Sequence, residues 1–367
     1  MKYWRGYLVA GIVALITWAL GYFAAAHTEL IDMVYPYIDR IVMDYLASWS
    51  SNFAGCLWQT LFTFLIVLII ASGVLMFVLR WNPIQWFGWV LAVFSVISLV
   101  NTGVYGLNEH TGSIAEDIRL EVNEYSAGSL ERAANYYRDM ANTYADKVSR
   151  NSDGSVKVSE FDKLALSAAE GFEYLSYERM YPIFTGTTIP VKQLGWSDQY
   201  QGVTGITMGI TGEAAVNPNV PSVGLPFAIC HEMSHRMCIY DDSDADFGAF
   251  LACTSHSDPE FIYSGYLLAF RCCYNALSSI QSELGKDALQ RVLKGVDDRV
   301  LADMDRYNRF FGDSATNVDA DFCNLLVSWH IQEIAKYEEE EDTQDIFDPM
   351  DENDDRFQDI LNPATSE

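Results

Sequence analysis

His231 and His235, with Glu232 between them, have the residue types and the spacing of a metal site. Pro226 suits the first turn of a helix, and the apolar residues after it continue that helix through both histidines. Residues four apart share one helix face, so both imidazoles can bind a single ion. Glu232, beside the first histidine, is then placed to hold a water molecule bound to that metal. The HExxH pattern predicts a zinc site of the kind that hydrolyses peptide bonds.

Chance is a poor explanation of this pattern. With 6 histidines in 367 residues, and glutamate at roughly one residue in twenty, HExxH should arise on the order of once in 200 such chains. The alternative is an ordinary helix face, but Ala228, Ile229 and Cys230 indicate that this helix is buried. Two histidines and a carboxylate on a buried helix need a partner, which a metal ion supplies.

A third protein ligand is expected nearby, because catalytic zinc is held by three side chains. If a helix begins near Asp242, then Asp242 and Asp246 share a face, so Asp242 can bind zinc while Asp246 hydrogen-bonds a ligand imidazole. Asp244 is the second candidate ligand. Asp241 stands at the third-ligand position of HExxHxxGxxH enzymes, although Cys238 replaces their glycine. At least one of these acids is expected only to cap the helix.

A resemblance to a known family rests on the segment TGITMGITGEAAVNPNVPSVGLPFAICHEMSHRMCIYDDSDADFGAFLAC and on DPEFIYSGYLLAF after it. Both are similar to a bacterial family of three-helix membrane proteins known only as a domain of unknown function, whose members resemble zinc metallopeptidases. The resemblance extends over the membrane helices and the domain up to about Trp329, and its specific motifs are TGEAAVN, LPFAICHEMSH and YSGY.

Asp242, Ala245 and Asp246 resemble the ExxAD pattern of M48-like membrane metallopeptidases, in which the first acid binds zinc and the last supports the site. Members of the family of unknown function typically have glycine in place of Cys238, and glutamates with an asparagine in place of the aspartates. Aspartate is one methylene shorter than glutamate. The resemblance implies a zincin-like fold and a metal site, without a particular substrate.

These residues predict a zinc metallopeptidase that acts on a peptide or protein. Zinc on His231, His235 and Asp242 leaves a fourth position for water, whose pKa falls toward about 7. Glu232 is the expected general base, which takes a proton from that water and passes it to the leaving amine. The oxyanion needs a further donor, for which the candidates are Tyr263, Tyr266, His256, Arg271 and His330.

The rival hypothesis is a non-catalytic membrane sensor or scaffold that retains a metal site. Glu232 favours the enzyme, because a purely structural site has no use for that carboxylate. A transporter is disfavoured, because no ionisable residue lies between Gly55 and Leu79. The chain has 23 basic and 50 acidic residues, a net charge of −27, so phosphate repulsion excludes a nucleic-acid partner.

Apolar residues gather in the first part of the chain. Three uncharged stretches predict a multi-pass membrane domain over residues 1–108, embedded in a lipid bilayer, with helices at about 7–26, 55–79 and 84–107. A cleaved signal peptide ending near Ala26 is the alternative for the first stretch, but its apolar run of about 20 residues exceeds the usual length.

The few basic residues near these helices predict the orientation. Lys2 and Arg5 precede the first helix, and Arg80 lies between the second and third, so these ends are expected in the cytoplasm of a bacterial cell. The loop at residues 27–54 and everything after Asn108 are then expected outside, which makes the catalytic domain extracytoplasmic.

Residues 109–337 are long enough for one extramembrane domain. Helical periodicity is strong over 129–150, whereas residues 183–223 carry the Gly, Thr, Val and Ile of short strands. Residues 206–217 are a candidate edge strand for pairing with an extended substrate. The expected fold class is mostly α: three transmembrane helices followed by an α-rich α+β zincin-like domain with a small edge sheet.

The remaining features are an acidic end and scattered cysteines. Residues 338–367 are expected to be a disordered acidic tail. Seven cysteines form no CxxC pair and no regular framework, so they are expected mostly as small buried hydrophobes. An odd number cannot all pair within the chain. No pattern in the sequence indicates an oligomeric state.

Overall fold

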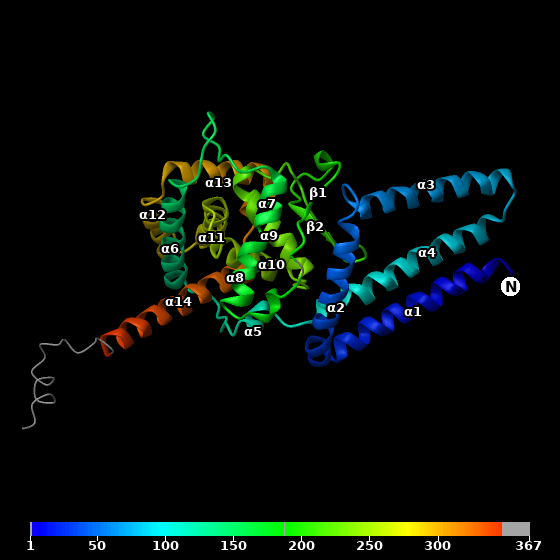
Figure 1. Ribbon diagram of the computed structural model, residues 1–367, viewed down its shortest axis with the longest axis horizontal. Helices are drawn as coiled ribbons and strands as arrows, with labels where there is room; N and C mark the ends of the chain where they lie inside the picture. The colour runs from blue at the N-terminus through cyan, green and yellow to red at the C-terminus, as the bar shows by residue number, and fades with distance from the viewer. Residues whose placement is uncertain (1, 187, 347–367) are drawn as a thin grey trace, which may run out of the picture.

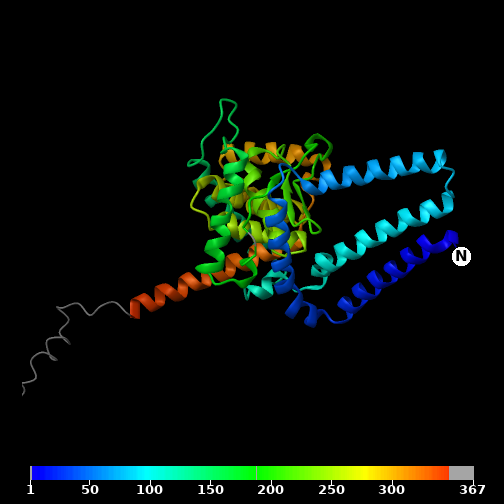
Figure 2. The ribbon, with the colours of Figure 1, turned by 45° about the vertical axis from the view of Figure 1, so that its right-hand side comes forward.

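The computed structural model describes residues 2–186 and 188–346 and has two parts, a group of long apolar helices and a larger helical domain (Figure 1). The apolar helices α1 (Arg5–Ala26), α3 (Leu57–Val78) and α4 (Pro83–Val104) are long and apolar enough to cross a membrane. Their number and approximate bounds are as predicted. They extend from one side of the domain, with the N-terminus and the turn between α3 and α4 at the far end (Figure 2).

Glycine allows α1 and α4 to approach each other closely. A Cβ atom on Gly6 would lie 2.4 Å from the carbonyl carbon of Gly88, and one on Gly88 would lie 2.7 Å from the ring of Tyr7. Neither distance leaves room for a side chain, so only glycine fits at both positions. The contact lies near the N-terminal ends of both helices, which run parallel.

A helix that the sequence analysis missed, α2 (Thr28–Ser50), lies between the apolar helices and the domain (Figure 1). Its buried residues recur every three to five positions and form one face: Ile31, Pro36, Asp39, Met43, Ala47 and Ser50. Arg40 on this helix donates from Nε to the carbonyl oxygen of Met237 at 3.3 Å. The predicted loop at 27–54 is therefore largely a helix that packs on the domain.

Asp39 is a carboxylate buried in this contact, with 1% of its surface exposed. Its Oδ2 accepts hydrogen bonds from Asn108 Nδ2 at 2.5 Å and from Cys238 Sγ at 3.3 Å. Its Oδ1 has no hydrogen-bond partner among the described residues. Burial disfavours the charged form and raises the pKa of Asp39 to about 6.

This shift predicts a pH dependence of stability. The folded-state pKa of Asp39 is above its unfolded value of about 3.9. The free energy of unfolding is therefore highest below pH 4, where Asp39 is protonated, and falls by about 3 kcal/mol as pH rises through 6. Asp39→Asn is expected to remove this part of the pH dependence, whereas Glu29→Gln on the exposed face of α2 is not. The melting temperature of the detergent-solubilised protein at pH 5 and pH 8 measures the difference. An unchanged pH dependence in Asp39→Asn would contradict it.

The domain is mostly α-helical, as predicted. Its centre is formed by α9, α10 and α11, most of whose residues are buried. The helices are α5 (Ile114–Asp117), α6 (Ala127–Ala145), α7 (Phe161–Ser167), α8 (Ala169–Tyr177), α9 (Leu225–Arg236), α10 (Asp242–Thr254), α11 (Pro259–Ser279), α12 (Glu283–Leu293), α13 (Asp298–Phe311) and α14 (Ala320–Ile346). Helix α14 runs into the predicted acidic tail and so extends past the point where disorder was expected; residues 347–367 lie outside the described part.

Three short strands form one sheet in the order β1–β3–β2. They are β1 (Lys192–Gln193), β2 (Gly205–Met208) and β3 (Glu213–Val216); β3 pairs parallel with β1 and antiparallel with β2. The candidate edge strand at 206–217 is thus two strands. The edge position was right for β2 and wrong for β3, which lies in the middle of the sheet and is buried along its whole length.

Candidate metal centre

The two histidines lie on α9, near its C-terminal end. Pro226 occupies the first turn of this helix, as the sequence predicts. The helix stops because Cys238 adopts a left-handed conformation, with φ at 74°, which favours glycine. The turn brings the carbonyl oxygen of Ile239 to 2.8 Å from Nδ1 of His235. The same turn therefore ends α9 and fixes the orientation of the His235 ring.

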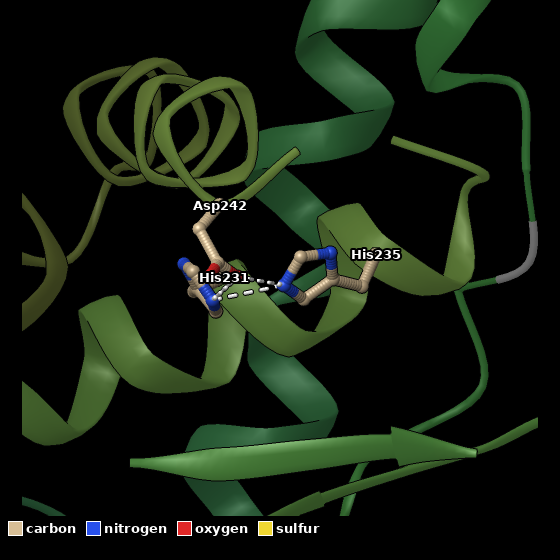
Figure 3. Close-up of side chains that lie close together, drawn as sticks. All are labelled: His231, His235 and Asp242. Atoms are coloured by element: carbon tan, nitrogen blue, oxygen red, sulfur yellow. Dashed lines mark hydrogen bonds and ion pairs between the residues drawn. The ribbon is translucent and has the colours of Figure 1, made fainter. Parts of the chain in front are cut away.

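Three potential ligand atoms converge beside α9 (Figure 3). The Nε2 atoms of His231 and His235 are 3.0 Å apart. Oδ1 of Asp242 is 3.2 Å from Nε2 of His235 and 4.0 Å from Nε2 of His231. Tetrahedral zinc with bonds of about 2.0–2.1 Å separates its ligand atoms by about 3.3 Å. The three atoms are thus spaced as ligands of one small ion.

The outer nitrogen of each imidazole faces an acceptor. Nδ1 of His231 lies 2.7 Å from Oδ1 of Asp246, and Nδ1 of His235 faces the Ile239 carbonyl. Each Nδ1 therefore donates a proton to its acceptor, and when both rings are neutral their Nε2 lone pairs point at each other over 3.0 Å. Two lone pairs at this distance repel unless a cation lies between them. The donor set therefore fits a bound metal ion.

The charges around the histidines also favour a bound cation. Burial opposes the charged form of His231, but Asp246, Glu232 and Asp242 outweigh it and raise the pKa of His231 to about 9. The hydrogen bond from His235 lowers the pKa of Asp242. The site is built to attract positive charge, whether a proton or a metal ion.

The four aspartates after α9 have different roles, because α10 begins at Asp242. Asp241 caps this helix by accepting from the backbone N–H groups of Ser243 and Asp244, at 2.9 and 3.2 Å. Both carboxylate oxygens of Asp244 are engaged, since they accept from Ser113 Oγ and from the N–H of Ile114. Asp242 and Asp246 are one turn apart and face the histidines.

Glu232 points from α9 toward the sheet and is 2% exposed. Its Oε2 accepts a hydrogen bond from Thr207 Oγ1 on β2 at 2.7 Å. A Cβ atom on Gly205 would lie 2.4 Å from Oε1 of Glu232, so a glycine is needed where the strand passes the carboxylate. Burial, together with the nearby Cys238 and Glu232, raises the pKa of Tyr105, which follows α4, well above its usual value.

Thr207, Gly205 and Tyr105 were not identified from the sequence. Threonine and glycine in a strand, and tyrosine at the end of an apolar helix, are ordinary residues in those elements. The place of Thr207 and Gly205 beside Glu232 depends on how β2 packs on α9. The sequence contained an indication only for β2, because residues 206–217 were expected to pair with an extended substrate.

A cavity of about 90 Å³ adjoins the metal centre, and its lining includes His231, Asp246, Arg271 and Tyr307. Arg271 is the one predicted oxyanion donor of the five that shares this cavity. Its guanidinium donates to Asn308 Oδ1 and to the carbonyl oxygen of Ala315, each at 2.6 Å. The other four lie in the core: Tyr263 donates to Asp303, His256 faces the Ser167 carbonyl, and Tyr266 and His330 pack against Tyr136 and Tyr137.

The model of a family described as "Protein of unknown function (DUF3810)" matches residues 31–326, which include α2, two of the apolar helices and the metal centre. No curated protein and no solved structure matches the chain.

Proposed function

We propose that this chain, which belongs to the family of proteins of unknown function DUF3810, is a membrane-anchored zinc metallopeptidase with a zincin-like site. The observation that carries the proposal is the convergence of the Nε2 atoms of both histidines and the Asp242 carboxylate within a few ångströms, beside the buried Glu232. A structural zinc site is closed by four protein ligands. Three ligands next to a carboxylate that is not among them are typical of a hydrolytic site.

Zinc bound to His231, His235 and Asp242 would supply an activated water and polarise the peptide carbonyl. Glu232 accepts the proton of the attacking water and delivers it to the leaving nitrogen. Thr207 holds the Glu232 carboxylate through the hydrogen bond to Oε2. Asp246 and the Ile239 carbonyl keep the two imidazoles in the tautomer that leaves both Nε2 atoms free to bind.

The strand β2 supports a peptide as the substrate. It lies at the edge of the sheet, so one side of its backbone has no strand partner in the described part of the chain. It also carries Thr207, which contacts the general base. An extended peptide that adds to this edge would pass directly beside Glu232.

The arrangement of the apolar helices supports an extracytoplasmic domain. The N-terminus and the turn that contains Arg80 lie together at the end of the helices far from the domain (Figure 1). Lys2, Arg5 and Arg80 therefore favour the cytoplasm for that end, with the domain on the other side of the bilayer.

The proposal is tested with the zinc-loaded, detergent-solubilised full chain and a mixture of peptides of random sequence. New N-termini identified by mass spectrometry would report cleavage. We expect cleavage that 1,10-phenanthroline abolishes and added zinc restores. Protein that holds one zinc per chain and cleaves nothing in the mixture would instead favour the non-catalytic scaffold.

Gly205→Ala tests the position of the general base. The added methyl group must displace Glu232 or β2, and a misplacement of about 1 Å can cost about 100-fold in rate. We therefore expect about 100-fold slower hydrolysis with the zinc content unchanged. Gly128→Ala in α6, where the nearest atom lies 3.9 Å away, is the matched control. Equal rates in the two variants would contradict the proposed position.

A further inference from the structure

Three cysteines meet inside the domain, on helices that carry none of the proposed metal ligands. Cys272 and Cys273 lie on α11, and Cys323 lies on α14. The Sγ atoms of Cys272 and Cys323 are 2.7 Å apart, whereas a disulfide bond measures about 2.05 Å. Cys272 is 8% exposed and Cys323 is fully buried. The two sulfur atoms are already closer than an ordinary non-bonded contact.

The hydrogen bonds among these thiols favour a thiolate on Cys323. Hydrogen bonds with the thiols of Cys272 and Cys273 lower the pKa of Cys323. The thiolate is the form that attacks a disulfide. The native packing thus brings the Cys323 sulfur against Cys272, and a thiolate on Cys323 can exchange with a disulfide oxidant while the chain folds.

We propose that Cys272 and Cys323 form a disulfide bond that joins α11 to α14. The Cys323 thiolate attacks a protein or small-molecule disulfide, which gives a mixed disulfide and releases one thiolate of the oxidant. The Cys272 thiol then loses its proton, attacks the Cys323 sulfur and releases the second thiolate. In sum, the two cysteines lose two protons and two electrons, and the oxidant's disulfide becomes two thiols.

Burial determines when this bond forms. Neither sulfur is open to a bulky oxidant in the folded domain, so the bond forms during folding. Oxidants of this class act outside the cytoplasm, on the side of the bilayer where the proposed function puts the domain. The bond also fixes the wall of the cavity beside the metal centre, because Cys272 lines it together with His231 and Asp246.

The test counts thiols in the full chain taken directly from membranes. The sample is acid-quenched to stop exchange, denatured, alkylated and digested without reduction. We expect five labelled cysteines of the seven, and one linked peptide pair that contains Cys323. We also expect dithiothreitol to lower the melting temperature by roughly 10 °C, because the bond closes a loop with a sequence separation of 51 residues.

Single variants identify the partner and control for folding. Cys273→Ser and Cys56→Ser should keep the linked pair, and Cys323→Ser should lose it and label all six remaining cysteines. Seven labelled cysteines in the parent would overturn the proposal. A link that survives in Cys272→Ser and disappears in Cys273→Ser would overturn the assigned partner. None of these readouts depends on zinc or hydrolysis.

Discussion

Glu232→Gln is expected to lower peptide hydrolysis by about 10²–10⁴-fold while zinc stays bound. Glutamine has the shape of glutamate and can still accept the hydrogen bond from Thr207 Oγ1, so the packing of α9 against β2 is preserved. An amide cannot take the proton of the attacking water, so the contribution of the general base is lost. The ligand atoms are on other residues, so the metal remains.

The measurement pairs a cleavage rate with a zinc determination on the same sample. Glu178→Gln, an exposed position directly after α8, controls for the loss of one carboxylate and should retain the parental rate. Parental hydrolysis by the zinc-bound Gln variant would remove Glu232 from the mechanism. Loss of zinc would show that Glu232 holds the metal rather than the water.

Asp242→Ala is expected to weaken zinc binding more than any other change among the four aspartates. It removes a ligand atom, whereas Asp246→Asn removes only the carboxylate behind His231, a change that typically costs 10–100-fold in metal affinity. Asp241→Asn should leave affinity unchanged, because that side chain caps α10. Zinc dissociation constants from competition with a chelator would rank the variants.

Two results would contradict this ranking. Equal affinities in Asp242→Ala and Asp241→Asn would place the third ligand elsewhere. A larger loss of zinc affinity in Asp244→Asn would make Asp244 the third ligand, although both of its carboxylate oxygens already accept hydrogen bonds from Ser113 and Ile114. The side chain of Asp242 is 89% exposed, so its removal should leave the core intact.

Local patterns in the sequence predicted the parts of the site that one helix determines. The spacing of His231 and His235 places both imidazoles on one side of α9 wherever that helix packs. The start of α10 at Asp242 likewise follows from a capping aspartate before a helical run. These are properties of neighbouring residues, so one segment of sequence contains them.

Other parts depend on contacts between distant segments, and no local pattern reports those. Helix α2 was missed because Pro36 interrupts its helical pattern and Asp39 lies on the face that is buried. Thr207 reaches Glu232 only because β2 packs on α9. The tail was expected to be disordered from its charge, yet α14 continues to Ile346 from a well-packed start.

The most direct test of the account is the zinc content per chain of the detergent-purified parent and of His231→Ala prepared in the same way. The account predicts about one zinc in the parent and almost none in the variant, because the variant lacks one of two Nε2 ligands. Parent protein that stays metal-free after reconstitution with zinc would contradict the metal centre and the peptidase built on it.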